Sequence, residues 1–312
     1  MEQSSKTQKI VVLIPCLNEE ITIGKVIQDF KQHLPEADIV VFDNNSTDRT
    51  AEIARQEGAV VIRESRRGKG FVVASMFRKV QADYYIMVDG DDTYMASHVR
   101  DLLKPLLEDD ADMVVATRLN VYEEKSFRPL HVFGNNLVRS LVNWIFDSNL
   151  RDIMSGYRAM TREVVLNVPV LSSGFEVETE MTIRTLDYGY RIHEVPVPYK
   201  ERPEGSFSKL RTFHDGFRVL STIGTIAKAY KPFTFFGVFA LMFFGMGMLT
   251  GIEVILDYLE DMYVNKVPTA ILASGFMILG FGSMGMGIIL HTLNDRFKEL
   301  TRLAQKHVHQ ER

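Results

Sequence analysis

Three carboxylates follow a run of apolar residues in the segment YYIMVDGDDTY, residues 84–94. Crowding the like charges of Asp89, Asp91 and Asp92 after a buried strand raises the free energy, unless a cation lies among them or the segment is a solvated turn. Hard divalent cations favour oxygen ligands, often one or two carboxylates together with phosphates. Asp89 and Asp91 are spaced to converge on one ion, and Gly90 permits a close approach or a special backbone angle. Both interpretations stay open, and we expect Asp92 to be only a solvated neighbour.

Other polar residues gather where further apolar runs end, in IPCLNEE, VFDNNSTD, IRESRRGKG and ATRLN. RRGKG is not a P-loop, because the second glycine and the Ser/Thr of that motif are missing. Lys69 between two glycines could reach a diphosphate, although a solvated lysine in a turn fits as well. Helix capping is the role we expect for Ser46 and Asp48.

The elements that must position these residues follow an alternating pattern. Continuous or β-rich apolar runs predict strands at 9–15, 38–43, 59–64, 84–89, 112–118 and 190–199. Helical patterns lie between them at 20–34, 46–58, 68–80 and 96–109, the last interrupted by Pro105. Such alternation predicts an α/β fold with a mostly parallel, doubly wound sheet. Ligands of these sheets bind outside the carboxyl ends of the strands, where the polar residues gather.

The C-terminal part differs in composition from the rest. Residues 233–252 and 267–290 carry no charged side chain, and about 20 apolar residues suffice to cross a bilayer as a helix. The link between them is acidic, whereas basic residues flank the pair on both sides. The positive-inside rule then places the N-terminal domain and both termini in the cytoplasm. Two buried core helices are the alternative.

Two smaller features accompany these spans. Residues 208–231 place apolar residues at helical spacing among basic ones, which favours an amphipathic helix in the membrane interface over one packed on the domain core. Gly247 and Gly251 form a small-xxx-small pair that permits close helix contact, within the hairpin or in a homo-oligomer. The expected organisation is a domain at 1–207, this helix, a hairpin at 232–292 with spans at about 233–256 and 267–291, and a tail at 293–312.

Composition excludes some classes of protein. The formal net charge of −4 gives no basic field for nucleic acid, and the single cysteine, Cys16, excludes an internal disulfide.

Six motifs together resemble a known family. VVLIPCLNEE, VFDNNSTDRT, RRGKG, VDGDD, SGYRAM and RPEGSFSK occur in the order found in family 2 glycosyltransferases of the GT-A fold. Over about residues 9–230 the layout is similar to that of polyprenyl-phosphate glycosyltransferases such as dolichyl-phosphate mannose synthases. Some of these carry a C-terminal membrane hairpin.

The resemblance implies roles for individual residues. Mg²⁺ or Mn²⁺ would bind Asp89 and Asp91, and Glu178 would orient sugar hydroxyls, unless it lies on an exposed helix face. Catalytic roles fall to Asp89, Asp91, Asp152 and Arg158, with Ser155 in the same acceptor-side motif. Nucleotide contacts fall to Pro15, Leu17, Glu19, Asp43, Asn45, Lys69, Asp89 and Gly90. The acceptor phosphate would meet Arg202, Ser208 and Lys209.

At two positions the chain departs from the family pattern. Thr93 stands where a glutamine is frequent, which leaves the third protein ligand of the metal open. Asn44 replaces a frequent second aspartate, so the choice of nucleobase is open as well.

The expected reaction is sugar transfer from a UDP- or GDP-sugar to undecaprenyl or dolichyl phosphate at the cytoplasmic membrane face, with inversion. A phosphate monoester has a second pKa near ~6, so the acceptor needs no strong general base. A processive polysaccharide synthase is disfavoured, because the only tryptophan, Trp144, lies outside a QxxRW signature. A transferase acting on another acceptor and a non-catalytic, membrane-anchored nucleotide-sugar-binding scaffold remain alternatives.

Overall fold

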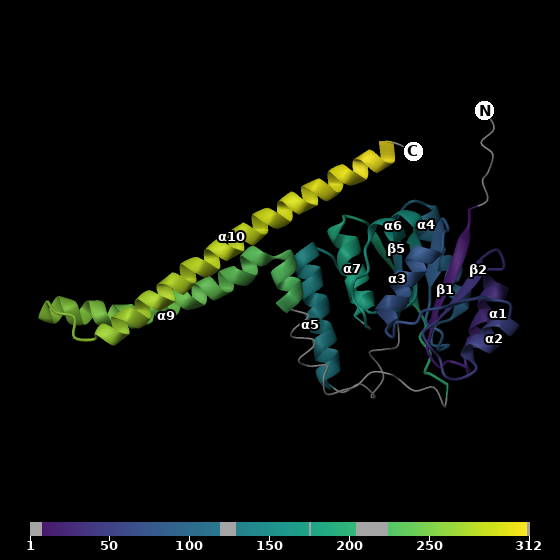
Figure 1. Ribbon diagram of the computed structural model, residues 1–312, viewed down its shortest axis with the longest axis horizontal. Coiled ribbons are helices and arrows are strands. Elements are labelled where there is room, and N and C mark those ends of the chain that lie inside the picture. The colour runs from purple at the N-terminus through teal and green to yellow at the C-terminus, as the bar shows by residue number, and fades with distance from the viewer. Residues whose placement is uncertain (1–7, 119–128, 175, 204–223, 311–312) are drawn as a thin grey trace. The chain divides into compact units, whose positions relative to one another are not determined.

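A computed structural model describes residues 8–118, 129–174, 176–203 and 224–310. The chain divides into two units, Met1–Thr212 and Phe213–Arg312, which we describe separately (Figure 1). The first contains one seven-stranded sheet in the order β3-β2-β1-β4-β6-β5-β7. Its strands are β1 (Ile10–Cys16), β2 (Asp38–Asp43), β3 (Val60–Arg63), β4 (Tyr84–Met87), β5 (Met113–Arg118), β6 (Arg158–Thr161) and β7 (Ile192–Val197).

Helices cover both faces of this sheet. The first unit contains α1 (Ile23–His33), α2 (Thr50–Gln56), α3 (Lys69–Lys79), the 3₁₀ turn η1 (Ala96–His98), α4 (Val99–Leu107), α5 (Pro129–Phe146), α6 (Arg162–Asn167) and α7 (Val177–Asp187). Alternate residues of β1 point to opposite faces. Val12 and Ile14 pack with apolar residues of α1 and α4, whereas Val11 and Leu13 pack with those of α3, α6 and α7. The doubly wound α/β architecture is thereby confirmed.

One strand runs against the others. β1 to β4 are parallel, and β5 is parallel to β7, but β6 is antiparallel to both β4 and β5. The sequence pattern did not reveal β6, which is only four residues long. Its register places Arg158 opposite Met87, so the chain entering β6 passes beside the carboxylates that follow β4.

Pro105 does not interrupt its helix, contrary to expectation. α4 continues past Pro105 to Leu107. The proline lacks a backbone N–H, but so close to the end of the helix only one hydrogen bond is lost, and the helix tolerates it. The Pro105 carbonyl then accepts hydrogen bonds from the amides of Asp110 and Ala111, at 2.9 and 3.2 Å.

The second unit contains α9 (Pro232–Asp261) and α10 (Val267–Gln310), which lie along one another (Figure 1). Both are long and apolar enough to cross a membrane, and most of their apolar side chains face outward. Their glycines permit the contact, since a Cβ on Gly247 would lie 3.0 Å from Met277 Sδ and one on Gly280 would lie 2.6 Å from the Phe244 ring. Gly247 therefore serves the close contact within the hairpin, whereas a Cβ on Gly251 would make only an ordinary contact, 3.7 Å from the Ala273 Cβ.

The helices that contain the two expected spans are longer than the spans. α9 extends to Asp261, and α10 continues without a break to Gln310. Most of the expected amphipathic helix at 208–231 lies outside the described residues. Its described part is helical at 224–230.

Candidate active site

The carboxyl ends of β1, β2 and β3 bring three sequence motifs together. The parallel register aligns Cys16 with Asp43 and Asp43 with Arg63. Asp43 is buried, and its Oδ1 accepts a hydrogen bond from the Ser46 amide at 3.1 Å. Pro15 is half-buried at the end of β1. The edge on which nucleotides are bound in such sheets thus carries these residues, as the strand pattern predicted.

The loops after β1 and β2 are tied to each other. The Asn18 amide donates to Ser46 Oγ at 3.0 Å, and the Glu19 amide donates to Thr50 Oγ1 at 2.8 Å. Leu17 and Glu19 are half-buried in this pair of loops. Ser46 therefore links two loops and does not cap α2 as we expected.

Asp48 fulfils the expected capping role from just outside the helix. Its Oδ1 accepts the Thr50 amide at 3.0 Å, while Oδ2 accepts the Glu20 amide at 3.2 Å.

The two asparagines after Asp43 hold the loop that follows β3. Asn44 is buried, donates to the carbonyls of Glu64 and Arg66 at 3.1 and 2.7 Å, and accepts the Gly68 amide at 2.8 Å. Asn45 has a φ of 61° and accepts from Arg63 Nε at 2.9 Å. The side-chain amide of Asn44 is thus fully used in holding the loop after β3. This structural role explains why Asn44 stands where the family frequently has a second aspartate.

Lys69 lies between two carboxylates from distant segments. Its Nζ is 2.5 Å from Asp89 Oδ1 and also forms an ion pair with Glu178, on α7. Burial alone lowers the pKa of the ammonium, but the two carboxylates outweigh it and hold the pKa of Lys69 above its usual value. Lys69 is therefore not a solvated turn residue, and Glu178 is buried, not exposed on its helix.

Glycines bring these segments into contact. A Cβ on Gly70 would lie 1.9 Å from the Ser172 carbonyl oxygen, and one on Gly68 would lie 2.0 Å from that of Ser173. Gly68 also has a φ of 134°, which side-chain-bearing residues rarely adopt. The start of α3 thus packs directly on the backbone just before α7, which brings Lys69 and Glu178 together.

Gly156 plays the same role at Asp89. A Cβ there would lie 2.3 Å from Asp89 Oδ2, so glycine allows the loop before β6 to approach this carboxylate without displacing it. At Gly90 a Cβ would lie 2.7 Å from Cys16 Sγ. Gly90 therefore serves a close approach, since its φ is not among the positive ones of the described chain.

Asp91 and Asp92 point to different partners. Asp91 is 3% exposed, accepts from Thr93 Oγ1 at 2.6 Å through Oδ1, and lies 2.5 Å from Arg202 Nη2 through Oδ2. Asp92 is only 9% exposed and lies 2.6 Å from Lys25 Nζ, with a φ of 55°. The expectation that Asp92 is a solvated neighbour is wrong, because Lys25 on α1 compensates its buried charge.

Asp152 has a cationic partner that sequence reasoning missed. Arg118, the last residue of β5, donates to Asp152 through Nε at 2.6 Å and through Nη2 at 2.9 Å. Burial lowers the pKa of this guanidinium, but Asp152 more than compensates and keeps it above the usual value. Arg118 also lies over the Tyr199 ring, with Cζ 5.6 Å from the centroid. Its place at a strand end, in ATRLN, was the signal that could have identified it.

The SGYR segment is held by Tyr94. The Tyr94 hydroxyl lies 3.1 Å from Ser155 Oγ and accepts the Gly156 amide at 3.0 Å. Arg158 is fully buried beneath this loop, where it donates to the carbonyls of Ser155 and Ile153 at 2.8 and 3.0 Å. Burial lowers the pKa of Arg158. These contacts hold the guanidinium of Arg158 beneath the SGYR loop.

The donor atoms near Asp91 fit a divalent cation of the kind that takes few protein ligands. Two carboxylates at positions i and i+2 suit Mg²⁺ or Mn²⁺ with phosphates completing the shell. Within the described residues no cluster of three or more histidine, cysteine, aspartate or glutamate side chains is placed to hold a metal. Among the described residues, Asp89 and Asp91 are the carboxylates that we assign to the metal. Thr93, where the third ligand was left open, donates its hydroxyl to Asp91 Oδ1.

Of the proposed acceptor-phosphate residues, only Arg202 can be placed. Ser208 and Lys209 lie outside the described residues.

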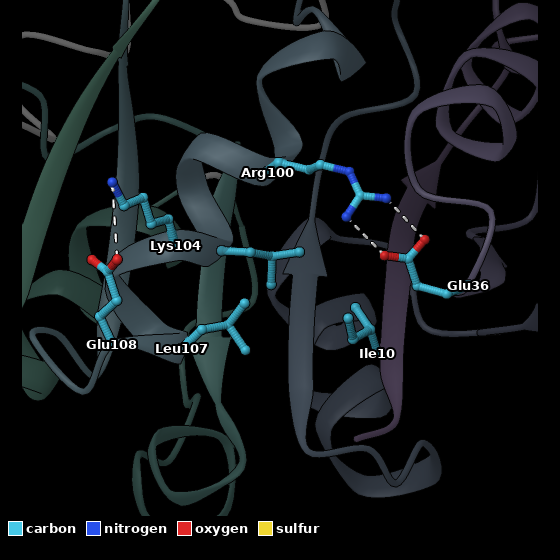
Figure 2. Close-up of a pocket in the computed structure, with 7 residues that line it drawn as sticks. Ile10, Glu36, Arg100, Lys104, Leu107 and Glu108 are labelled. Atoms are coloured by element: carbon cyan, nitrogen blue, oxygen red, sulfur yellow. Dashed lines mark hydrogen bonds and ion pairs between the residues drawn. The ribbon is translucent and has the colours of Figure 1, made fainter. Parts of the chain in front are cut away.

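A pocket of about 210 Å³ lies at the other end of the strands. Its lining includes Ile10, Leu103 and Leu107, and the Arg100–Glu36 ion pair at 3.0 Å lies at its side (Figure 2). Ile10 begins β1, so this pocket is remote from the polar strand ends and contains none of the proposed site residues.

Comparison with known proteins agrees with the motif order. The sequence model described as Glycosyl transferase family 2 matches residues 11–168. "Glycosyltransferase AglJ" of Haloferax volcanii is 32% identical over 299 residues, covering 94% of this chain and 98% of the relative. A "Dolichyl-phosphate hexose transferase" of the same organism is 31% identical, covering 69% of this chain and 92% of the relative.

Solved structures show the same fold. A glucosyl-3-phosphoglycerate synthase from Mycobacterium tuberculosis, crystallised with Mn²⁺ and UDP-glucose, superposes with a TM-score of 0.56 at 23% identity. The match covers 71% of this chain and 79% of that one, which confirms a GT-A-like fold.

Proposed function

The chain belongs to glycosyltransferase family 2, and from that premise we propose that it transfers a sugar from a nucleoside-diphosphate sugar to a polyprenyl phosphate at the cytoplasmic face of a membrane. The relative named as a dolichyl-phosphate hexose transferase supports the acceptor class. The Mn²⁺ and UDP-glucose bound by a structural neighbour support the donor class and the metal. The hairpin of α9 and α10 supports membrane attachment, with the catalytic unit and both termini cytoplasmic.

One observation carries the proposal. A guanidinium suited to bind a phosphate lies in direct contact with a carboxylate suited to bind a metal on a diphosphate. Asp89 and Asp91 follow the central strand β4, and Arg202 contacts Asp91 directly. A bound divalent metal would supply charge neutralisation for the departing diphosphate. Asp43 and the loops after β1 and β2 hold the nucleoside, and Arg202, Ser208 and Lys209 bind the acceptor phosphate.

In the proposed reaction an acceptor phosphate oxygen attacks the anomeric carbon from the side opposite the leaving group. The bond from that carbon to the diphosphate oxygen breaks, and the nucleoside diphosphate keeps the electron pair. The configuration therefore inverts. Because a phosphate monoester is largely ionised at neutral pH, no residue needs to remove a proton from it.

The test is incubation of the full-length protein in detergent with labelled UDP- and GDP-sugars, undecaprenyl or dolichyl phosphate, and Mn²⁺ or Mg²⁺. We expect a labelled lipid from at least one donor and none from Asp91→Asn protein of unchanged fold. If no donor gives a lipid product, the proposal fails. A labelled polysaccharide in place of a labelled lipid would replace the proposed acceptor.

A further inference from the structure

Arg202 occupies one of the two carboxylate oxygens that Asp91 has for a metal. Asp91 Oδ2 lies 2.5 Å from Arg202 Nη2, and Oδ1 accepts from Thr93 Oγ1 at 2.6 Å. Only 5% of the Asp91 side chain is exposed, so water screens this pair little. A cation that binds through Oδ2 must displace the guanidinium, because both would occupy the same side of one small carboxylate.

The backbone explains why Arg202 reaches this position. Tyr94 and Tyr199 form an antiparallel bridge, and the Lys200 amide donates to the Thr93 carbonyl at 2.9 Å. The bridge is an isolated one, because residues 90–92 form a turn and a bend in which Asp92 has a φ of 55°. It brings the segment that carries Arg202 beside the turn that carries Asp91, and the ion pair is formed between the two side chains.

We propose that Arg202 and the divalent metal are alternative occupants of Asp91. In the ligand-free protein Arg202 neutralises the carboxylate and lowers its affinity for metal. When Asp91 takes the metal with its donor, the guanidinium is released, and it becomes available to the acceptor phosphate. This exchange would favour binding of the donor before the acceptor. It rests on the proposed function for the identity of the two ligands, but not for the competition itself.

The neighbouring ion pair supplies a matched control. Asp92 lies 2.6 Å from Lys25 Nζ, one residue further along the chain, so Lys25→Gln removes the same charge from almost the same place. Lys25 contacts Asp92 and not Asp91. Removing the Lys25 ammonium therefore changes the electrostatic potential near Asp91 but does not free an oxygen of Asp91 for the metal. A purely electrostatic effect would appear in both variants, whereas competition for Oδ2 would appear only in Arg202→Gln.

The experiment measures the affinity of the full-length protein in detergent for Mn²⁺, in the absence of nucleotide and lipid. Electron paramagnetic resonance reports the concentration of free Mn²⁺. We expect Arg202→Gln to raise Mn²⁺ affinity about tenfold, as for loss of one charge-assisted competitor. The Mn²⁺ affinity of Lys25→Gln should stay within about twofold of wild type. In the double variant that combines Arg202→Gln with Asp91→Asn, the gain in Mn²⁺ affinity should disappear. Arg202→Lys, which keeps the charge but loses the planar fork, should fall between and serves if the glutamine variant misfolds.

Equal Mn²⁺ affinities in wild type and Arg202→Gln would overturn the inference, as would an equal gain in Lys25→Gln. The lipid-product assay separates this failure from failure of the proposed function. Arg202→Gln should raise the KM for polyprenyl phosphate even though it binds metal more tightly. An active wild-type enzyme with no affinity gain in the variant would leave the transferase proposal standing and remove the exchange.

Discussion

Four carboxylates of the candidate site are each paired with a cation from another segment. Asp89 pairs with Lys69, Asp91 with Arg202, Asp92 with Lys25 and Asp152 with Arg118. The crowding of like charges that marks the sequence is therefore compensated by groups that the chain itself supplies. Removing one such partner from a buried pair costs more than the pair contributes, because the remaining charge is left without compensation.

Lys69→Met tests this compensation where one ammonium serves two carboxylates. Asp89 and Glu178 would then face each other unpaired, and we expect the free energy of unfolding to fall by about 3 kcal/mol. Chemical denaturation with a fluorescence readout measures the change.

Adding Glu178→Gln to Lys69→Met should recover part of the loss, because one of the two unpaired charges is removed. Additive single changes in this double-mutant cycle would contradict the shared ion pair.

Gly156→Ala tests the contact between the SGYR loop and Asp89. The new Cβ would lie 2.3 Å from Asp89 Oδ2, and this carboxylate is 25% exposed, so it can move aside. We expect Mn²⁺ and donor affinity to fall about tenfold while the melting temperature changes little. Isothermal titration measures both affinities, and Gly237→Ala in α9, where nothing lies within 4 Å, is the control. Unchanged affinities would show that Asp89 does not bind these ligands.

At the scale of elements, the strands up to β5 and the location of the site could be predicted from the sequence. Continuous apolar runs ending in polar residues indicate buried parallel strands, and such strands end on one edge. The antiparallel β6 could not be predicted, because Arg158–Thr161 is short and strand direction leaves no periodic signal. The pairing of Lys69 with Glu178, 109 positions later in the numbering, likewise depends on a backbone contact that no local pattern encodes.

That backbone contact is testable with Gly70→Ala. The added Cβ would lie 1.9 Å from the Ser172 carbonyl oxygen, and a backbone atom cannot rotate away as a side chain can. We expect the free energy of unfolding to fall by about 2 kcal/mol and lipid-sugar synthesis to be lost, because Lys69 and Glu178 are separated. Thermal unfolding and product assays measure the two effects.

Gly24→Ala is the matched control, because its Cβ would meet only side chains, that of Ile53 at 3.2 Å and that of Glu57 at 3.8 Å. If both variants behave alike, the contact with Ser172 has no special role.

At the scale of the whole chain, α10 is longer than a bilayer requires. Its 44 residues give a helix of about 66 Å, whereas the hydrocarbon core is about 30 Å thick. The uncharged run from 267 to 290 is long enough to span that core, so the charged remainder must extend beyond it. The proposed topology places this remainder in the cytoplasm and the acidic link between α9 and α10 on the opposite side.

Cysteine labelling tests this topology. Cys16 is 2% exposed, which gives a quiet background for single cysteines introduced by Tyr263→Cys in the link or Glu299→Cys in the charged part of α10. A membrane-impermeant maleimide added to intact cells should label Tyr263→Cys. It should label Glu299→Cys only after permeabilisation, and wild type in neither case. Labelling of Glu299→Cys in intact cells would reverse the orientation. The polar ends of β1 to β5 would then lie on the side of the membrane opposite to the one proposed, and the proposed cytoplasmic reaction would be excluded.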